Sequence, residues 1–386
     1  MNNSKKLFCE SEKCCGCGSC KHICPTNSII FKKNLFGNQV FIDNKTCVHC
    51  GLCEKVCQFH KSIELSEPLF WKEGWCTNED IRKASSSGGL AKTIALSCLE
   101  RGWKIFMCVS KEKSFCYEEV CEKEILNISG SFYVKSSLGS VFKTIKKYLL
   151  AKEKVLFIGL PCHVSSVKQF LFNVPSDNFY TIDLICHGTP SLDLFKAFSE
   201  EEKINDYRDL SFRQKNKSSY KPLKFDYWIT PFLDGLTYTD NCYNCNFASK
   251  KRVSDLTLGD SWGSDLDDFE RNKGISLLLI NTEKGKELIP EKGVFLRDAN
   301  IEKSVKAQGQ LQSPSKLPPK RYLFTEKISS GFGYHKIIKK IYLKKIIVSY
   351  FRNIPFVYYI YRKIKPPRSP SYISFSLEKR KNTAVK

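Results

Sequence analysis

The chain has 386 residues, 42% of them hydrophobic, so it can bury the cores of two or three domains and is too long for a small disulfide-stapled module. Its formal net charge is +22, and its 19 cysteines, an odd number, argue against a closed set of disulfides. The start, MNNSKKLFCE, has no apolar run after its lysines, which predicts a cytoplasmic protein. Thiols stay reduced in that compartment, so clustered cysteines indicate metal binding or catalysis.

The first predicted element is a repeated cysteine motif, C-x2-C-x2-C-x3-C, within residues 1–66. Three thiolates at this spacing surround one corner of a 4Fe-4S cluster, and the fourth cysteine of each run binds the other cluster. The spacing therefore predicts two clusters, with Gly16, Gly18 and Gly51 at positive φ near the sulfides. One predicted cluster is held by Cys14, Cys17, Cys20 and Cys57, and the second by Cys47, Cys50, Cys53 and Cys24.

A zinc site is the alternative for these cysteines, but zinc sites usually join a C-x2-4-C pair to a second pair across a longer loop. The pattern resembles bacterial two-cluster ferredoxins, apart from Gln58, which stands where a second proline is usual. Cys15 falls outside the spacing and is expected to be a bystander. Residues 28–43 predict two strands around a turn, and SEPLFW (66–71) predicts a linker.

The next predicted element is the turn SSSGG (85–89), followed by a helix with apolar residues at Leu90, Ile94, Leu96 and Leu99. A turn that leads into a helix N-terminus presents free backbone N–H groups and the positive end of the helix dipole, which suits a phosphate. The alternative is an ordinary helix cap with flexible serines, because the segment lacks a full G-x-G-x-x-G motif.

Three predicted strands follow, each ending in a turn. Their alternation with helical segments predicts an α/β domain over residues 67–330 with a parallel or mixed sheet. Pro161 is expected to begin a helix, and Cys162 and Cys186 are expected at the carboxyl ends of strands, where such sheets bind ligands. The three segments are VLFIG (155–159), FYTIDL (179–184) and SDLTLGDSWG (254–263).

Four further cysteines lie in turns after strands or in a C-x2-C pair. Four thiolates are what another 4Fe-4S cluster needs, so they predict a third cluster. In one alternative, Cys162 is a redox thiolate of low pKa near a helix start. In another, the C-x2-C pair binds zinc or is structural. The four are Cys162, Cys186, Cys242 and Cys245.

Several segments, taken in order after a two-cluster ferredoxin, resemble the coenzyme F420 hydrogenase/dehydrogenase beta-subunit family over roughly residues 10–310. The resemblance implies an iron–sulfur flavoprotein with FAD in the α/β domain, and turns at Cys162 and Cys186 beside the flavin and a further cluster. It departs at 131–137, where a lysine and a glutamine are expected at Phe132 and Lys135. The segments are SSSGG, IGLPCHVSSVK, DLICHGTPS, CYNCNFASKKRVSDLTLGDSWG and GISLLLINTEKGKEL. The expected flavin contacts are Ser86, Ser87, Gly88 and Gly89.

Three polar residues are candidates for catalysis. His163 and His187 could supply protons to reduced flavin or substrate, although such histidines more often hydrogen-bond the backbone. Asp260 could hold a ribose hydroxyl, act as an acid or simply form a turn.

The last segment, 331–386, is a basic aromatic tail with 14 Lys or Arg against one acid, Glu378, and it is expected to be helical. Arg352, Asn353 and Pro355 interrupt it, so it is not expected to span a membrane. It could lie on an anionic membrane as a peripheral contact, bind nucleic acid, dock on an acidic partner or on its own core, or simply be solvated.

Two function classes follow. In the first, the chain is a ferredoxin-linked FAD-dependent reductase that passes electrons between 4Fe-4S clusters and FAD to an organic acceptor, with polysaccharide biosynthesis as one setting. In the second, it is an electron-transfer subunit without its own substrate that relays electrons to a partner enzyme. The absence of a G-x-G-x-x-G motif favours a redox partner protein over a nicotinamide as donor. A metal-bearing nucleic-acid binder is a third, weaker class.

Overall fold

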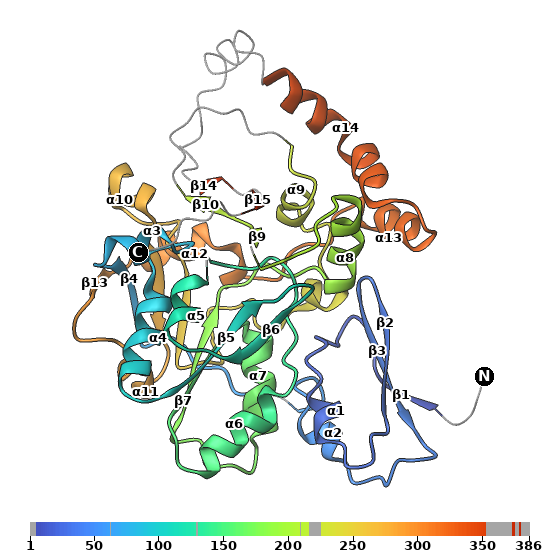
Figure 1. The fold of residues 1–386 in the computed structure, drawn as a ribbon, viewed down its shortest axis with the longest axis horizontal. Helices are drawn as coiled ribbons and strands as arrows, with labels where there is room; N and C mark the ends of the chain where they lie inside the picture. Colours follow the sequence, from blue (N-terminus) through green and yellow to red (C-terminus); the bar gives the residue numbers. More distant parts are fainter. Residues whose placement is uncertain are drawn as a thin grey trace.

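The structure is a computed structural model that describes residues 5–61, 63–128, 130–208, 210–215, 225–352, 373–374 and 378–379. A small N-terminal part with the cysteine runs lies beside a larger part built on one wide sheet (Figure 1). The two helices of the small part, α1 and α2, face the large part, and α1 lies against its helix α7.

The N-terminal part contains a three-stranded antiparallel sheet in the order β1-β3-β2. The two strands expected within residues 28–43 are confirmed as β2 and β3, which form a hairpin. The elements are β1 (Lys5–Cys9), α1 (Ser19–Ile23), β2 (Ile29–Asn34), β3 (Gly37–Asp43) and α2 (Leu52–Lys55).

The large part is built on an eight-stranded sheet in the order β13-β4-β12-β11-β8-β7-β5-β6. Strands β5, β7, β8 and β11 are parallel and the remaining pairs are antiparallel, so the expected mixed sheet is confirmed. The strands are β4 (Phe70–Cys76), β5 (Lys104–Ser110), β6 (Phe115–Glu119), β7 (Val155–Gly159), β8 (Phe179–Leu184), β11 (Leu256–Asp260), β12 (Ser276–Ile280) and β13 (Val294–Asp298).

One part of the expected linker belongs to this sheet. Phe70 and Trp71 begin β4, which pairs with both β12 and β13, so the linker prediction is wrong for these two residues. The apolar pair Phe70–Trp71 is short, and its partner strands lie about 200 residues later in the chain.

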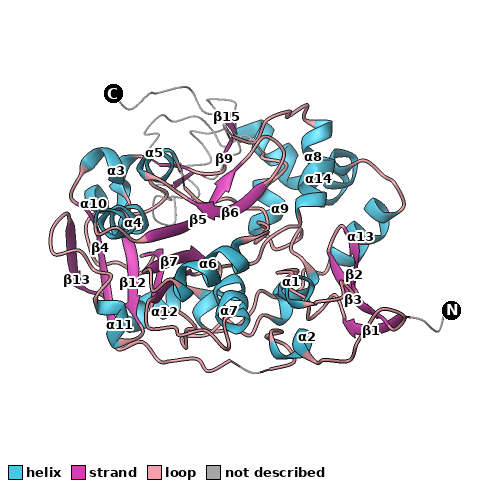
Figure 2. Ribbon diagram, turned by 60° about the horizontal axis from the view of Figure 1, so that its bottom comes forward, coloured by secondary structure: helices cyan, strands magenta, loops and turns pink. Residues whose placement is uncertain are grey.

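Successive residues of the central strands face opposite sides of the sheet, as the pleat requires. Ile105 and Leu156 join an apolar cluster with α4, whereas Phe106 and Phe157 join another with α6 and α7. The helices of this part therefore cover both faces of the sheet (Figure 2). They are α3 (Glu79–Lys83), α4 (Leu90–Glu100), α5 (Glu122–Asn127), α6 (Val141–Leu150), α7 (Pro161–Phe170), α10 (Asp268–Lys273), α11 (Glu283–Lys286) and α12 (Ile301–Ala307).

A third group of elements packs beyond the β6 edge. It contains α8 (Leu192–Glu201), α9 (Ile229–Leu233), the 3-10 helix Asp240–Asn244, α13 (Arg321–Ser329) and α14 (Tyr334–Arg352), whereas the 3-10 helix Gly309–Leu311 follows α12 and packs against β4 and β12. Two short pairs join β9 (Leu210–Ser211) to β15 (Glu378–Lys379) and β10 (Gln214–Lys215) to β14 (Ile373–Ser374).

The helical start of the basic tail is confirmed as α14, which leaves helical geometry at Tyr342. The residues before that point bury Ile337, Ile338 and Ile341 against the core shared with α8 and α13. Beyond it, Ile347 and Val348 are exposed. Most of the tail after residue 352 lies outside the described residues. Within the part of the chain that the structure describes, no helix is both long and apolar enough to cross a membrane.

Candidate functional site

The second cysteine run, together with Cys24, lines a small cavity of about 20 Å³. Two thiols that line this cavity accept hydrogen bonds from the backbone: His49 N lies 3.4 Å from Cys47 Sγ, and Ser28 N lies 3.3 Å from Sγ of Cys24, the last cysteine of the first run. Burial alone would raise the pKa of Cys24, but the hydrogen bonds from Ser28 and Thr26 outweigh this effect and lower the pKa. Backbone N–H groups aimed at sulfur favour the thiolate form that iron requires. The four predicted ligands Cys24, Cys47, Cys50 and Cys53 all line the cavity.

The first run gathers on the inner side of the N-terminal part. Burial raises the pKa of Cys20, and the charges of Cys17, Cys14 and Cys57 raise it further. The thiol of Cys14 accepts a bond from Gly16 N at 3.4 Å. The structure therefore brings these four predicted ligands together and brings Cys53, a ligand of the other predicted cluster, near them.

The backbone of both runs has the predicted conformation. Gly16, Gly18 and Gly51 have φ of 71°, 83° and 69°, so their predicted positive φ is confirmed. His49, at the position that corresponds to Gly16 in the repeat, also has a positive φ of 52°. A side chain is tolerated there because His49 is exposed, whereas a Cβ on Gly16 would lie 2.6 Å from Asn38 Nδ2.

These loops fit four-iron clusters by cysteine spacing and by backbone donors to sulfur. A cubane spreads its four thiolates around a cage, while a single ion draws its ligands to one point. Among the described residues, no group of three or more His, Cys, Asp or Glu side chains is close enough to share one metal ion.

Cys15 and Gln58, the two departures from the ferredoxin pattern, meet where the N-terminal part contacts α7. Gln58 Nε2 lies 2.8 Å from Cys15 Sγ and 3.2 Å from the carbonyl oxygen of Cys162. Both side chains are buried, and the Cys162 thiol raises the pKa of Cys15. Gln58 thus joins the two parts of the molecule, a contact that a proline could not make.

The predicted ligands of a third cluster converge beside this contact. Burial and then the charges of Cys242 and Cys245 raise the pKa of Cys186 to about 12. Tyr117 lies within electrostatic reach of both Cys162 and Cys186. Gly188 N donates to Cys186 Sγ at 3.4 Å, as in the ferredoxin loops.

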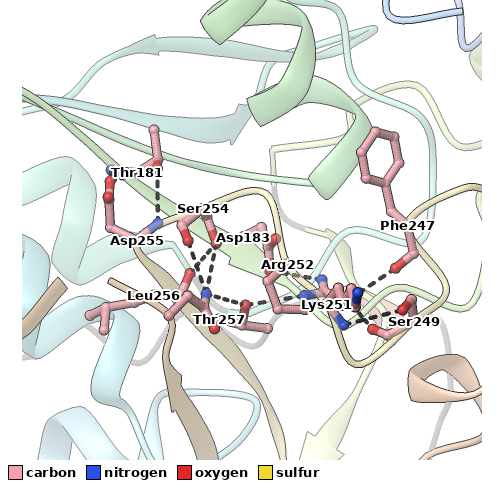
Figure 3. A network of polar contacts seen from close by, with 11 residues as sticks. Thr181, Asp183, Phe247, Ser249, Lys251, Arg252, Ser254, Asp255, Leu256 and Thr257 are labelled. Atoms are coloured by element: carbon pink, nitrogen blue, oxygen red, sulfur yellow. Dashed lines mark hydrogen bonds and ion pairs between the residues drawn. The ribbon is translucent and has the colours of Figure 1, made fainter. Parts of the chain in front are cut away.

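A buried ion pair holds the segment that follows Cys245 (Figure 3). Arg252 Nη2 lies 2.8 Å from Asp183 Oδ1 of β8, with 2% and 0% of the two side chains exposed. Arg252 Nη1 also donates to the carbonyl oxygens of Phe247 and Ser249 at 3.0 and 3.1 Å. The C-x2-C segment is therefore tied to the central sheet by one arginine.

A cleft of about 440 Å³ opens at the carboxyl ends of β7, β8 and β11. Its size is that of a small-molecule or cofactor site, and its position is where α/β sheets bind ligands. Cys186 lines the cleft, so the third group of cysteines borders it directly.

The SSSGG turn forms one side of this cleft and leads into α4, as expected. Ser86, Ser87 and Gly89 line the cleft, while Gly88 lies behind it and donates its N–H to Ser276 Oγ at 2.9 Å. Ser87 Oγ donates to the carbonyl oxygen of Ile275 at 2.7 Å, so this serine is used to fix the turn. Gly89 caps α4 at φ 88°, and the helix N-terminus borders the cleft through Leu90. The turn fits an anionic group such as a cofactor phosphate.

The polar candidates take different positions. His187 and Asp260 line the cleft, and burial lowers the pKa of His187 although the Asp260 charge opposes this. His163 is fully buried behind the cleft, with Nδ1 3.1 Å from the hydroxyl oxygen of Tyr117, which lines it. Burial and the Lys135 charge lower the pKa of His163 to about 3, so its ring is neutral near pH 7.

Two functional candidates were missed by the sequence reasoning. Arg213 lines the cleft and makes a two-point ion pair with Asp260 at 2.8 and 2.9 Å. Lys135 lies among the cysteines of two groups. No spacing rule identifies either residue in the sequence. The lysine at position 135, where the resembled family has a glutamine, was the one sequence feature that pointed to this position.

A cofactor-sized cleft with a group of cysteines at its border and two further cysteine runs beyond it is typical of a redox protein. Residues 152–296 match the family model for the C-terminal region of the coenzyme F420 hydrogenase/dehydrogenase beta subunit. This segment of the chain is thus similar to the C-terminal part of beta-type subunits of hydrogenases and dehydrogenases.

Among solved structures, the chain is similar to a chain of the F420-reducing [NiFe] hydrogenase complex from Methanosarcina barkeri, from work on its xenon derivatization. The identity is 16%, the TM-score is 0.44, and the match covers 69% of this chain and 95% of that chain. A search of curated proteins finds no match.

Proposed function

We propose that this protein is an iron–sulfur flavoprotein in which 4Fe-4S clusters exchange electrons with FAD in the cleft. The observation that supports this is the order of the cysteine groups. Cys50 of the second run is exposed at the surface, Cys14 and Cys20 of the first run are buried, and Cys186 of the third group lines the cleft. Cys53 links the first two groups and Cys15 links the first to the third.

The chain's own residues have separate tasks in this proposal. The backbone donors of the loops direct N–H groups at the sulfur atoms, the SSSGG turn and the α4 N-terminus bind the phosphates, and Arg213 makes an ion pair with Asp260 in the cleft. When bound, FAD supplies the exchange between one-electron and two-electron chemistry. Neutral His187 stands in the cleft as a candidate proton carrier.

The first test is the iron, sulfide and flavin content after anaerobic purification. About twelve irons and one FAD per chain are expected for three cubanes and a flavin. About eight irons without flavin would leave only the ferredoxin part of the proposal. Cys242→Ser should then remove about four irons and one cluster signal; unchanged iron would contradict the third cluster.

We further propose that the chain reduces an organic acceptor itself, because the cleft has room beside its phosphate-binding turn and contains Arg213, Asp260 and His187. A setting in polysaccharide biosynthesis is supported by the family resemblance alone. The competing proposal is a relay subunit that passes electrons to a partner enzyme. Turnover of candidate acceptors by the isolated chain with a reduced dye separates the two, since a relay subunit gives none.

The end of α14 supports a separate proposal of peripheral membrane contact. Lys344 and Lys345 are exposed there beside exposed Leu343, Ile347 and Val348, a combination that favours an anionic membrane surface. Flotation with liposomes rich in anionic lipid is the test. Equal flotation with neutral and anionic liposomes, or none with either, contradicts it.

A further inference from the structure

Lys135 is held at the meeting point of two cysteine groups. Its backbone N–H donates to the carbonyl oxygen of Pro190 at 2.8 Å. Its ammonium group donates to Thr239 Oγ1 at 2.8 Å and to Asn241 Oδ1 at 3.1 Å, on the segment that leads directly into Cys242. The side chain is therefore fixed in place and cannot move its charge freely.

Both of these hydrogen-bond partners are neutral. Among the described residues, no carboxylate lies within ion-pair distance of the Lys135 ammonium group. An ammonium group removed from water without a counter-charge is costly, and proteins normally supply one. In the proposed function, the counter-charge near Lys135 is that of the thiolate ligands of the clusters.

The groups that surround this ammonium are thiols. Cys242, Cys162, Cys15 and Cys14 all act on it electrostatically, and burial is the opposing effect. The Thr239 hydroxyl that accepts a hydrogen bond from the ammonium group lies 3.3 Å from Cys242 Sγ, so Lys135 is one polar group away from a proposed ligand of the third cluster. Cys14 belongs to the inner ferredoxin cluster of the proposed function, and Cys162 and Cys242 belong to its third cluster.

We propose that Lys135 holds a fixed positive charge between two clusters. This charge sets the reduction potentials of the inner ferredoxin cluster and of the third cluster together. The inference rests on the proposed function. A cluster that gains one electron becomes more negative by one charge, with no bond formed or broken, and a fixed cation nearby stabilises the reduced form. Because Lys135 is shared by the two groups, its charge keeps their potentials raised in parallel.

The test is a redox titration of the holoprotein, followed by the electron paramagnetic resonance signals of the clusters. In Lys135→Gln, we expect the ratio of reduced to oxidised form at a fixed potential to fall about tenfold for two of the three clusters, a shift of about 59 mV for a one-electron couple. The outer cluster, held by Cys24, Cys47, Cys50 and Cys53, should shift less. In Lys135→Arg, which keeps the charge, the potentials should stay near those of the unaltered protein.

Lys284→Gln is the matched control. The Lys284 ammonium also donates to two neutral oxygens, the carbonyls of Ser176 and Phe179, both at 2.7 Å, and the groups that act on it include no cysteine. No cluster potential should change in this variant. Equal shifts in Lys135→Gln and Lys284→Gln would overturn the inference.

The remaining outcomes are also decisive. Full iron content with unchanged potentials in Lys135→Gln overturns the inference, and so do equal shifts in the Gln and Arg variants, because shape and not charge would then be responsible. Loss of iron in the Gln variant with full iron in the Arg variant supports it. Failure of the proposed function is distinguishable, because it shows in the iron content of the unaltered protein.

Discussion

Gly88 determines how closely the cofactor turn approaches the sheet. A Cβ at this position would lie 2.4 Å from the carbonyl oxygen of Gly74 and 2.7 Å from Ser276 N. Both are backbone atoms of paired strands, so neither can move away without breaking the ladder between β4 and β12. The turn therefore needs a residue without a side chain.

We expect Gly88→Ala to lower the free energy of unfolding by about 1–3 kcal/mol, the usual cost of forcing an extra carbon into a packed site. Because the turn must shift, FAD content should fall as well. Chemical unfolding and flavin absorbance measure the two effects. Gly309→Ala is the control, since nothing lies within 4 Å of a Cβ there, and equal losses in both variants would refute this account.

At the residue scale, sequence alone predicts contacts that are local. The ligand spacing of the first two proposed clusters can be recognised in the sequence because each loop is one short turn. The glycines of these loops have the positive φ values that such a turn implies. The contact between Gln58 and Cys162 spans 104 residues, and that between Lys135 and Asn241 spans 106. No periodicity connects such positions, so the roles of Cys15, Gln58 and Lys135 appear only in the fold.

Among the elements, the segment after Cys245 depends on the buried pair of Arg252 and Asp183. In Arg252→Met, the Asp183 charge remains buried without its partner, and we expect unfolding to become easier by about 3–5 kcal/mol. The carbonyls of Phe247 and Ser249 also lose their donor, so iron bound through Cys242 and Cys245 should be lost first.

Urea unfolding and iron content measure these effects. Arg271→Met removes an ion pair whose two side chains are 35% and 56% exposed, and it should cost no more than about 1 kcal/mol. Similar unfolding curves for the two variants would show that the Arg252 pair does not hold this segment.

The start of α14 is capped by Glu201 of α8, which accepts hydrogen bonds from the backbone N–H groups of Tyr334 and His335. Burial alone would raise the pKa of Glu201, but the bonds from His335 and Tyr334 outweigh it and lower the pKa. Because the folded pKa is below the unfolded value of about 4.3, the stabilisation is present above that pH and is lost as the pH falls through the folded pKa.

Glu201→Gln should therefore increase hydrogen exchange in the first two turns of α14 at neutral pH. The added exchange that acid causes in the unaltered protein below about pH 4.3 should be much smaller in the variant. Glu200→Gln, one position away on α8, is the control and should behave like the unaltered protein. Identical exchange in all three proteins would rule out this cap.

At the element scale, patterns in one continuous segment predict well. The apolar run of β7 and the proline at the start of α7 are both local signals, and both elements form as expected. The first residues of β4 were assigned to a linker because a strand is recognised there only by its partners, β12 and β13, which come about 200 residues later.

For the molecule as a whole, the proposed clusters form a series from the surface to the cleft. Cys50 is exposed and Val48 beside it is 60% exposed, so a protein donor can approach the outer cluster most closely. The inner cysteines Cys14 and Cys20 are buried. Electrons from a bulky donor are therefore expected to enter through the second cysteine run.

Cys50→Ser should slow flavin reduction by a reduced ferredoxin-type protein at least about tenfold, because a damaged or displaced outer cluster interrupts the series. Reduction by a small dye that enters the cleft should be unchanged. Anaerobic stopped-flow absorbance measures both rates. If both donors slow equally, the outer cluster is not the entry point.

The bonds that fix the cofactor turn also set a time order during synthesis. Ser87 and Gly88 reach Ile275 and Ser276, each 188 residues further along the chain. While the ribosome is still synthesising the segment between the turn and Ile275, the cysteine runs can already fold. The turn cannot yet form, because its hydrogen-bond partners have not been made. Nascent chains halted before residue 276 should therefore acquire iron and yet be unable to retain a flavin.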